Sequence, residues 1–270
     1  MIYKKVYLRE NDPDIFLEVI APDKVGDYVR KAILVIPGGG YGAVCSNREG
    51  EPIALAFLPY GYSAFVLHYS VGGKRFYPAQ LIETSLAIKH IKDNAEEYGI
   101  DKDKVFTVGF SAGGHLSGSI ATMWHKKEVY DEIDMPYGYN KPTGSMLIYP
   151  VISGVQDFIQ IDSFHNLLGE DKPSFERRKE VSIEMNVDEK TSPMFIMHTS
   201  NDQIVDIRHS LCLCDALAKA GKTFEIHIYP DAPHGVALGN DITKCGCDKW
   251  SQKTIEKWVE AATMWAEKIN

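Results

Sequence analysis

Short runs of β-branched and other apolar residues alternate with longer amphipathic stretches along most of this chain. Such runs are typical of buried strands, and the longer stretches are typical of helices that cover a sheet. This alternation predicts an α/β fold, in which crossover helices connect mostly parallel strands. We expect eight strands, at residues 4–8, 15–20, 32–36, 64–69, 104–108, 145–149, 194–198 and 224–229, the first two as an antiparallel lead-in.

Helices are expected between these strands and after the last of them. The predicted ranges are 51–58, 78–98, 114–124, 206–220 and 249–269. Between residues 153 and 192 the alternation lapses into a polar, weakly periodic stretch, which we interpret as a small cap insertion over one edge of the sheet. Because no repeat or flexible linker divides the chain, we expect residues 1–270 to form a single domain.

The composition argues against several classes of partner. The chain has 29 Lys and Arg against 37 Asp and Glu, a net charge of −8, and neither sign forms a long block, so we expect no nucleic-acid partner. No apolar stretch of about 18 residues occurs, and the start of the chain lacks the apolar segment of a signal peptide. We therefore expect a cytoplasmic protein with no membrane partner. A homo-oligomer is left open.

The strongest chemical signal is the pentapeptide Gly-Phe-Ser-Ala-Gly at residues 109–113, between an expected strand and an expected helix. In this context a G-x-S-x-G sequence forms a nucleophile elbow, a sharp turn that presents its serine above the sheet. Glycines at both ends leave room for the crowded turn. We predict that Ser111 is a nucleophile and that the backbone amide of Ala112 donates to an oxyanion. The alternative is a glycine-rich turn that only packs close to a strand.

A second glycine-rich segment, Pro-Gly-Gly-Gly-Tyr-Gly, occupies residues 37–42 directly after an expected strand. Successive glycines allow backbone amides to point into a site, and we predict that Gly39 and Gly40 complete the oxyanion hole. The same segment formally fits the glycine spacing of dinucleotide-binding loops. No apolar helix opens there, however, and no acidic residue ends the next strand, so we expect no nucleotide cofactor.

A serine nucleophile needs a base and an orienting carboxylate at the same edge of the sheet. His234 lies in a tight loop directly after the last expected strand, and we predict that it is the base. The turn after the preceding strand carries two carboxylates, Asp202 and Asp206. Because Asp206 is placed to cap the next helix, we favour Asp202 as the partner of His234. The chain order Ser111, Asp202, His234 is that of the α/β-hydrolase fold.

We expect the other histidines and the five cysteines to have structural roles and no catalytic one. His115 is too close in sequence to Ser111 to act as its base, so we expect it to make a structural hydrogen bond beneath the site. The five cysteines are few for a chain of 270 residues and are odd in number, so we expect no disulfide framework. The pairs 212/214 and 245/247 have a shorter gap than zinc ligands use. We expect neither a metal ion nor an organic cofactor.

Taken together, the motifs resemble the α/β-hydrolase esterases of the acetyl esterase and lipase type, including the bacterial acetylxylan and feruloyl esterase-like group. The motifs that carry the resemblance are PGGGY at 37–41, PAQL at 78–81, GFSAGGHL at 109–116, YPV at 149–151, the turn with Asp202 and PHG at 233–235. The resemblance implies that short acyl esters, including acetyl groups on sugars, are hydrolysed through an acyl-enzyme. Pro37 and Tyr69 depart from the hormone-sensitive-lipase branch, so the alcohol part of the substrate stays open.

Three classes of function fit these residues. We favour a serine carboxylesterase that acts on a small ester, because a full triad and an oxyanion loop are costly to maintain for packing alone. An amidase or aminopeptidase would use the same triad and the same fold. A binding protein without catalytic activity is the third class.

Overall fold

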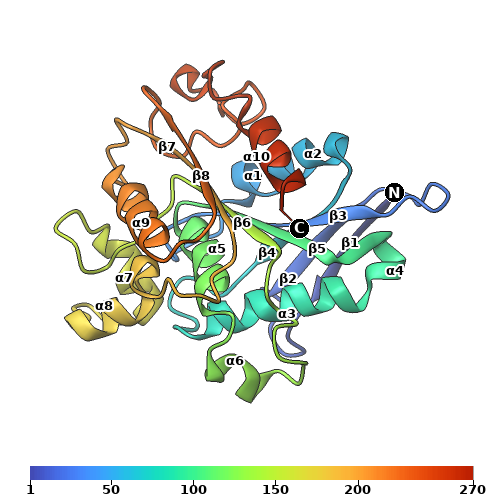
Figure 1. Cartoon of the computed structure of the whole chain (residues 1–270), viewed down its shortest axis with the longest axis horizontal. Coiled ribbons are helices and arrows are strands. Elements are labelled where there is room, and N and C mark those ends of the chain that lie inside the picture. The colour runs from blue at the N-terminus through green and yellow to red at the C-terminus, as the bar shows by residue number, and fades with distance from the viewer. Residues whose placement is uncertain (270) are drawn as a thin grey trace.

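The computed structural model describes residues 1–269, and its central element is one eight-stranded sheet (Figure 1). The strands are β1 (Ile2–Tyr7), β2 (Phe16–Ala21), β3 (Arg30–Ile36), β4 (Tyr62–His68), β5 (Ile100–Phe110), β6 (Gly144–Ile148), β7 (Met194–Thr199) and β8 (Phe224–Tyr229). Their order in the sheet is β1-β2-β4-β3-β5-β6-β7-β8. β2 is antiparallel to both neighbours, and the six strands from β4 to β8 in this order are parallel. The predicted sheet and its antiparallel lead-in are confirmed.

Helices cover both faces of this sheet. They are α1 (Ser46–Glu49), α2 (Glu51–Phe57), α3 (Ala79–Asp93), α4 (Ala95–Tyr98), α5 (Ala112–Met123), α6 (Lys127–Glu132), α7 (Ile161–Leu168), α8 (Phe175–Val181), α9 (Arg208–Lys219) and α10 (Trp258–Glu267), with 3-10 turns η1 (Leu58–Tyr60), η2 (Ile183–Met185) and η3 (Asp248–Trp250). α2 and α10 pack on one face, and α3, α5 and α9 pack on the other (Figure 1). Within residues 1–269, no helix has both the length and the apolar character needed to cross a membrane.

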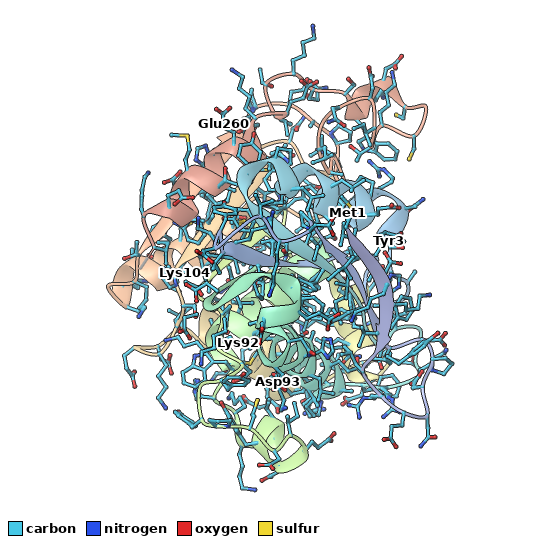
Figure 2. All side chains as sticks on the ribbon, turned by 90° about the vertical axis from the view of Figure 1, so that its right-hand side faces the viewer. Met1, Tyr3, Lys92, Asp93, Lys104 and Glu260 are labelled. Carbon is cyan, nitrogen blue, oxygen red and sulfur yellow. The ribbon has the colours of Figure 1, made fainter. Side chains whose placement is uncertain are left out.

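The central strands require this double cover because both of their faces are apolar. In β3, Leu34 and Ile36 belong to the core beneath α3 and α5, whereas Ile33 and Val35 belong to the core beneath α2 and α10. Successive side chains of a strand point to opposite faces, so an uninterrupted apolar strand has to be buried on both. The edge strand β1 is different, since its Tyr3 is 63% exposed (Figure 2).

Several predicted helices have different bounds in the structure. The helix expected at 78–98 is divided into α3 and α4 at Asn94, whose side-chain amide donates to the carbonyl oxygen of His90 at 2.8 Å. An asparagine side chain that bonds the backbone in this way competes with the helix. The helix expected at 249–269 begins only at Trp258, because Trp250 donates its indole N–H to the carbonyl oxygen of His234 instead. α1, α6 and α7 were not predicted, because each has only four to eight residues.

The segment 153–192 contains α7, α8 and η2. Its sequence looks polar, but Phe164, Leu167 and Leu168 of α7 are buried in the core that also receives α3 and α5. The segment is therefore packed against the body of the fold by one apolar helix face.

β5 passes directly into α5 through Ser111, whose φ of 53° lies in a region that residues other than glycine rarely adopt. Two glycines make this turn sterically feasible. A Cβ atom on Gly109 would lie 2.0 Å from the carbonyl oxygen of Gly113, and one on Gly113 would lie 2.1 Å from the carbonyl oxygen of Ile36. Helix α5 therefore packs against β3 with backbone next to backbone.

This close approach predicts that Gly113→Ala destabilises the protein, although alanine favours helices more than glycine does. The added methyl group would meet the Ile36 carbonyl oxygen at 2.1 Å, and α5 would have to move away from β3. We expect a loss of about 2 to 3 kcal/mol in the free energy of unfolding, measured with urea. The control is Gly118→Ala in the same helix, whose methyl would meet only side-chain atoms, at 3.2 Å. Equal stability of the two variants would contradict the packing described here.

Candidate active site

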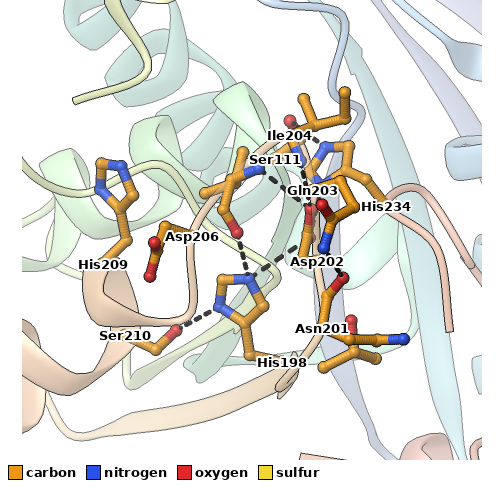
Figure 3. A network of polar contacts seen from close by, with 12 residues as sticks. Ser111, His198, Asn201, Asp202, Gln203, Ile204, Asp206, His209, Ser210 and His234 are labelled. Atoms are coloured by element: carbon orange, nitrogen blue, oxygen red, sulfur yellow. Dashed lines mark hydrogen bonds and ion pairs between the residues drawn. The ribbon is translucent and has the colours of Figure 1, made fainter. Parts of the chain in front are cut away.

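Three loops at the carboxyl ends of parallel strands bring Ser111, Asp202 and His234 together (Figure 3). Ser111 follows β5, Asp202 follows β7 and His234 follows β8. Nδ1 of His234 lies 2.7 Å from Oδ2 of Asp202 and donates to it, because a carboxylate only accepts. Nε2 is then the acceptor for the Ser111 hydroxyl, whose Oγ lies 2.8 Å away. The side chains of the predicted triad therefore form one hydrogen-bonded chain.

The Asp202 side chain has no exposed surface, yet its surroundings favour the charged form. Oδ1 accepts the backbone amides of Ile204 at 2.9 Å and Val205 at 3.0 Å. Burial by itself would raise the pKa of the Asp202 carboxyl, but hydrogen bonds from His198 and His234 hold that pKa well below its usual value. Asp202 is therefore a carboxylate throughout the neutral pH range.

Asp206, the rejected candidate, lies on the surface at the start of α9. Its Oδ1 accepts the backbone amide of Arg208 at 2.9 Å, and its Oδ2 pairs with the Arg208 guanidinium at 2.9 Å. These contacts fit the helix-end position expected from the sequence. The carboxylate within hydrogen-bonding distance of His234 is that of Asp202.

His198 is a second histidine at this carboxylate, a contact that the sequence analysis did not predict (Figure 3). It is buried in β7, where its Nε2 lies 2.9 Å from the carbonyl oxygen of Val205 and 3.4 Å from Oδ2 of Asp202. Because both of these oxygens only accept, Nε2 carries a proton. Nδ1 lies 2.7 Å from Oγ of Ser210. In the sequence His198 looks like any histidine within a strand. It meets Asp202 because the chain turns back after the end of β7.

The predicted oxyanion amides lie around Ser111. Gly39 and Gly40 line the same pocket as Ser111, with φ of 128° and 62°, which glycine adopts without strain. Ala112 is the first residue of α5, so its amide has no acceptor within the helix. Among the hydrogen bonds of residues 1–269, none has the amide of Gly39, Gly40 or Ala112 as its donor. All three amides are free to bind an oxygen atom that carries developing negative charge.

A pocket of about 350 Å³ opens beside Ser111 and His234. Its other side chains are mostly polar and come from α1, the start of α7, the turn after Asp202 and the segment before α10: Cys45, Asn47, Arg48, Glu49, Gln160, Ser163, Ile204, Val205 and Trp250. The Arg48 guanidinium stacks 3.7 Å from the centre of the Trp250 ring. A hollow of this size suits a small molecule.

His115 lies beneath the site and makes structural hydrogen bonds, as predicted. Its Nε2 donates to the carbonyl oxygen of Val181 at 2.8 Å, and its Nδ1 accepts from the Tyr41 hydroxyl at 2.8 Å. Burial lowers the pKa of His115 to about 4. A neutral imidazole therefore joins α5 to the end of α8.

The five cysteines are free thiols. Cys212 and Cys214 lie within α9, where residues two apart point in different directions. Within residues 1–269, no group of three or more His, Cys, Asp and Glu side chains has an arrangement that could hold a metal ion.

Comparison with known proteins identifies relatives of this chain. Residues 17–217 match the BD-FAE family. The endo-1,4-beta-xylanase B of Butyrivibrio fibrisolvens is 36% identical over 220 residues, which are 80% of this chain and 34% of that protein. The acetylxylan esterase of Xylanibacter ruminicola is 31% identical over 215 residues, 77% of this chain and 42% of that protein. The chain thus spans between a third and a half of the length of these curated relatives.

Solved structures confirm the α/β-hydrolase fold and the predicted resemblance to esterases. The acetyl ester-xyloside bifunctional hydrolase from Caldicellulosiruptor lactoaceticus superposes with a TM-score of 0.83 at 31% identity, over 98% of this chain and 96% of that one. The carboxylesterase Cest-2923 from Lactobacillus plantarum superposes with a TM-score of 0.85 over 99% of this chain and 98% of that one. Its 22% identity supports the fold alone.

The charge state of Asp202 predicts a pH-dependent contribution to stability. A carboxyl whose pKa is lower in the folded than in the unfolded chain stabilises the fold above its unfolded pKa of about 4, and that contribution is lost as the pH falls through the folded value. We expect Asp202→Asn to reduce the free energy of unfolding by about 2 kcal/mol above pH 5, with a difference that shrinks below pH 4.

Urea unfolding at a series of pH values measures this difference. Asp206→Asn is the control, since it removes a surface ion pair worth about 0 to 1 kcal/mol. A loss in Asp202→Asn that stays constant from pH 7 down to pH 3 would contradict the proposed charge state.

Proposed function

Since this chain belongs to the BD-FAE family and has the α/β-hydrolase fold, we propose that it is a serine carboxylesterase that hydrolyses short acyl esters, acetyl esters of carbohydrates in particular. The observation that carries this proposal is the hydrogen-bonded chain of Ser111, His234 and Asp202 at the edge of a pocket. The names of two relatives, an acetylxylan esterase and an acetyl ester-xyloside hydrolase, support the substrate class.

In the proposed acylation step, Oγ of Ser111 attacks the carbonyl carbon of the ester while Nε2 of His234 takes the hydroxyl proton. Asp202 stabilises the imidazolium that forms. The carbonyl oxygen becomes an oxyanion and accepts hydrogen bonds from the amide of Ala112 and from the glycine loop, Gly39 and Gly40. When the tetrahedral intermediate collapses, the alcohol leaves with the proton from His234, and the acyl group stays on Ser111.

Deacylation repeats these steps with water. His234 takes a proton from the water molecule, the resulting hydroxide attacks the acyl-enzyme, and the same amides stabilise the second oxyanion. Ser111 leaves with the proton from His234, and the carboxylic acid is released. These steps use groups of this chain, a small ester and one water molecule.

We further propose that the chain forms a single domain in which residues 153–192 act as a small cap. Gln160 accepts the backbone amide of Ser163 at 2.9 Å at the start of α7, and both residues line the pocket. These residues border the pocket on one side, and the proposed cap, at 40 residues, is too short to shelter a groove for a long acyl chain.

The triad assignment predicts that Ser111→Ala reduces kcat by about a million-fold and that His234→Ala reduces it to a similar level. The double variant should lose little more, because residues that act as a unit are not additive. Activity is measured with nitrophenyl acetate above the uncatalysed rate. Asp206→Asn, which changes a surface carboxylate near the site, is the control and should keep most of its activity. A loss below tenfold in Ser111→Ala would refute the assignment.

The short cap predicts a preference for short acyl groups. Each methylene buried in an apolar groove is worth about 0.8 kcal/mol, so a lipase gains kcat/KM as the chain lengthens. Here overpacking, at about 1 to 3 kcal/mol, should reverse that trend beyond about six carbons. We expect the highest kcat/KM between two and four carbons, measured with nitrophenyl esters of two to twelve carbons below their micelle-forming concentrations.

An optimum at eight carbons or more would argue for a lipase instead. Aminoacyl anilides belong in the same panel, because faster cleavage of anilides than of esters would favour the amidase class.

A further inference from the structure

A second buried carboxylate, Glu49, lies at the site although the proposed reaction steps do not use it. It ends α1, lines the pocket and is 5% exposed. Its Oε2 accepts the backbone amide of Gly38 at 2.8 Å, and its Oε1 accepts the hydroxyl of Tyr149 at 2.8 Å. Burial raises the pKa of Glu49, and the two hydrogen bonds oppose that rise only in part. A carboxylate in this position therefore carries a cost for the fold.

The contact with Gly38 fixes the loop that carries the proposed oxyanion amides. Gly38 directly precedes Gly39 in this loop. A Cβ atom on Gly38 would lie 2.8 Å from Oε2 of Glu49 and 3.0 Å from Cβ of Ser111. Because the loop backbone is held between the carboxylate and the serine, the position of Glu49 sets the distance between the amides and Ser111.

Tyr149 extends the same contact to the loop of His234. Its hydroxyl donates to Glu49 and accepts the backbone amide of Ala237 at 3.0 Å. The Tyr149 ring packs edge-on against the His234 imidazole, with 5.0 Å between the ring centres. Tyr149 itself has a φ of 38°, a strained conformation that persists only where the surroundings hold it.

We propose that Glu49 is a positioning residue for the reaction: it holds the oxyanion loop through Gly38 and the His234 loop through Tyr149, and its charge favours the imidazolium that forms on His234. This inference rests on the proposed function. Glu49 acts through these neighbours and exchanges no proton with the substrate. Glu49 makes the folded protein less stable at neutral pH, whereas its proposed contribution to the reaction appears only when positive charge develops on His234.

The charged surroundings of His234 set the direction of the effect. The groups that face it from the surrounding elements are Asp202, Ser111, Glu49, Tyr149, Arg48, Cys45 across the pocket and, through Asp202, His198. Arg48 donates to the carbonyl oxygen of Gly235 at 2.6 Å and is the permanent cation among them. Removing the negative charge of Glu49 takes away one attraction to the imidazolium of His234. It also leaves the positive charge of Arg48 without that nearby counter-charge. Both consequences disfavour the imidazolium.

The test is Glu49→Gln, which keeps the shape of the side chain and removes its charge. The glutamine oxygen accepts from Gly38, and its amino group faces the Tyr149 hydroxyl, which accepts through its second lone pair but loses the acceptor of its own O–H. We expect kcat to fall about ten- to a hundredfold, while KM changes less than about threefold. The midpoint of the acid limb of kcat/KM should move to lower pH by about half a unit or more.

The melting temperature at pH 7 separates this role from a structural one. A carboxyl whose pKa is raised in the fold favours folding only at low pH, and that contribution is lost as the pH rises through the folded value. In Glu49→Gln the removed buried charge and the lost acceptor of the Tyr149 hydroxyl act in opposite directions, so the melting temperature at pH 7 should change little. Wild-type kcat with an unmoved acid limb would overturn the proposal. So would a loss of kcat that comes with an unmoved acid limb and a lowered melting temperature.

Glu83→Gln is the matched control. Glu83 is also buried and, like Glu49, accepts one backbone amide and one hydroxyl, those of Ser70 at 2.8 Å and 2.6 Å; it pairs in addition with the Arg9 guanidinium at 3.3 Å. Glu83 does not line the pocket of Ser111. This variant should keep the kcat and the acid limb of the wild type.

Tyr149→Phe tests the same link if Glu49→Gln does not fold. It leaves the charge of Glu49 in place but removes the hydroxyl between Glu49 and the Ala237 amide. We expect kcat to fall about tenfold with an unmoved acid limb, and wild-type kcat would overturn the link.

Ser111→Ala distinguishes a failure of the proposed function from a failure of the proposed role of Glu49. If that variant stays active, the proposed function fails. If it is inactive while Glu49→Gln behaves like Glu83→Gln, only the role of Glu49 fails.

Discussion

The turn between β5 and α5 is the constraint on which the rest of the site depends. Ser111 is held at a positive φ because β5 is fixed in the sheet and α5 is pressed against the backbone of β3. Gly109 and Gly113 allow that contact, and no larger residue fits without moving the helix. One backbone geometry thereby places a hydroxyl over the carboxyl edge of the sheet and the unpaired amide of Ala112 beside it. The other loops of the site are arranged around this fixed point.

Two buried carboxylates, Asp202 and Glu49, lie at the site of His234, and their surroundings shift their pKa values in opposite directions. Hydrogen bonds from His198 and His234 and from backbone amides outweigh burial at Asp202 and lower its pKa. At Glu49 burial outweighs the donors Gly38 and Tyr149, and the pKa rises. In our account, Asp202 orients the imidazole in the resting state, whereas Glu49 contributes most when positive charge develops.

The sequence predicted those parts of the site that depend on local pattern and on the order of elements. The elbow at Ser111 has a local signature, because its glycines, strand and helix are adjacent in the chain. Asp202 and His234 were found because parallel strands end at one edge, so the turns after β7 and β8 meet there. The central strands follow from apolar runs that must be buried on both faces, whereas β1 and β8 lie at the edges of the sheet and are partly exposed.

What the sequence missed depends on contacts between distant segments. His198 and Glu49 have no local signature, since their partners come from a turn and from loops that only the fold brings near. The start of α10 was placed too early for the same reason: Trp250 is held by the carbonyl oxygen of His234 and by the guanidinium of Arg48. In each case a long-range polar contact decides the local structure.

The most direct measurement for the central claim is covalent labelling with a serine-directed phosphonate, followed by peptide mass spectrometry and an assay for residual ester hydrolysis. The account predicts one phosphonyl group per chain, attached to Ser111 and not to Ser117 or Ser119 of the same tryptic peptide, with activity lost in proportion to labelling. Prior conversion of Ser111 to alanine should abolish the label. Attachment at another residue, or full activity after complete labelling of Ser111, would contradict it.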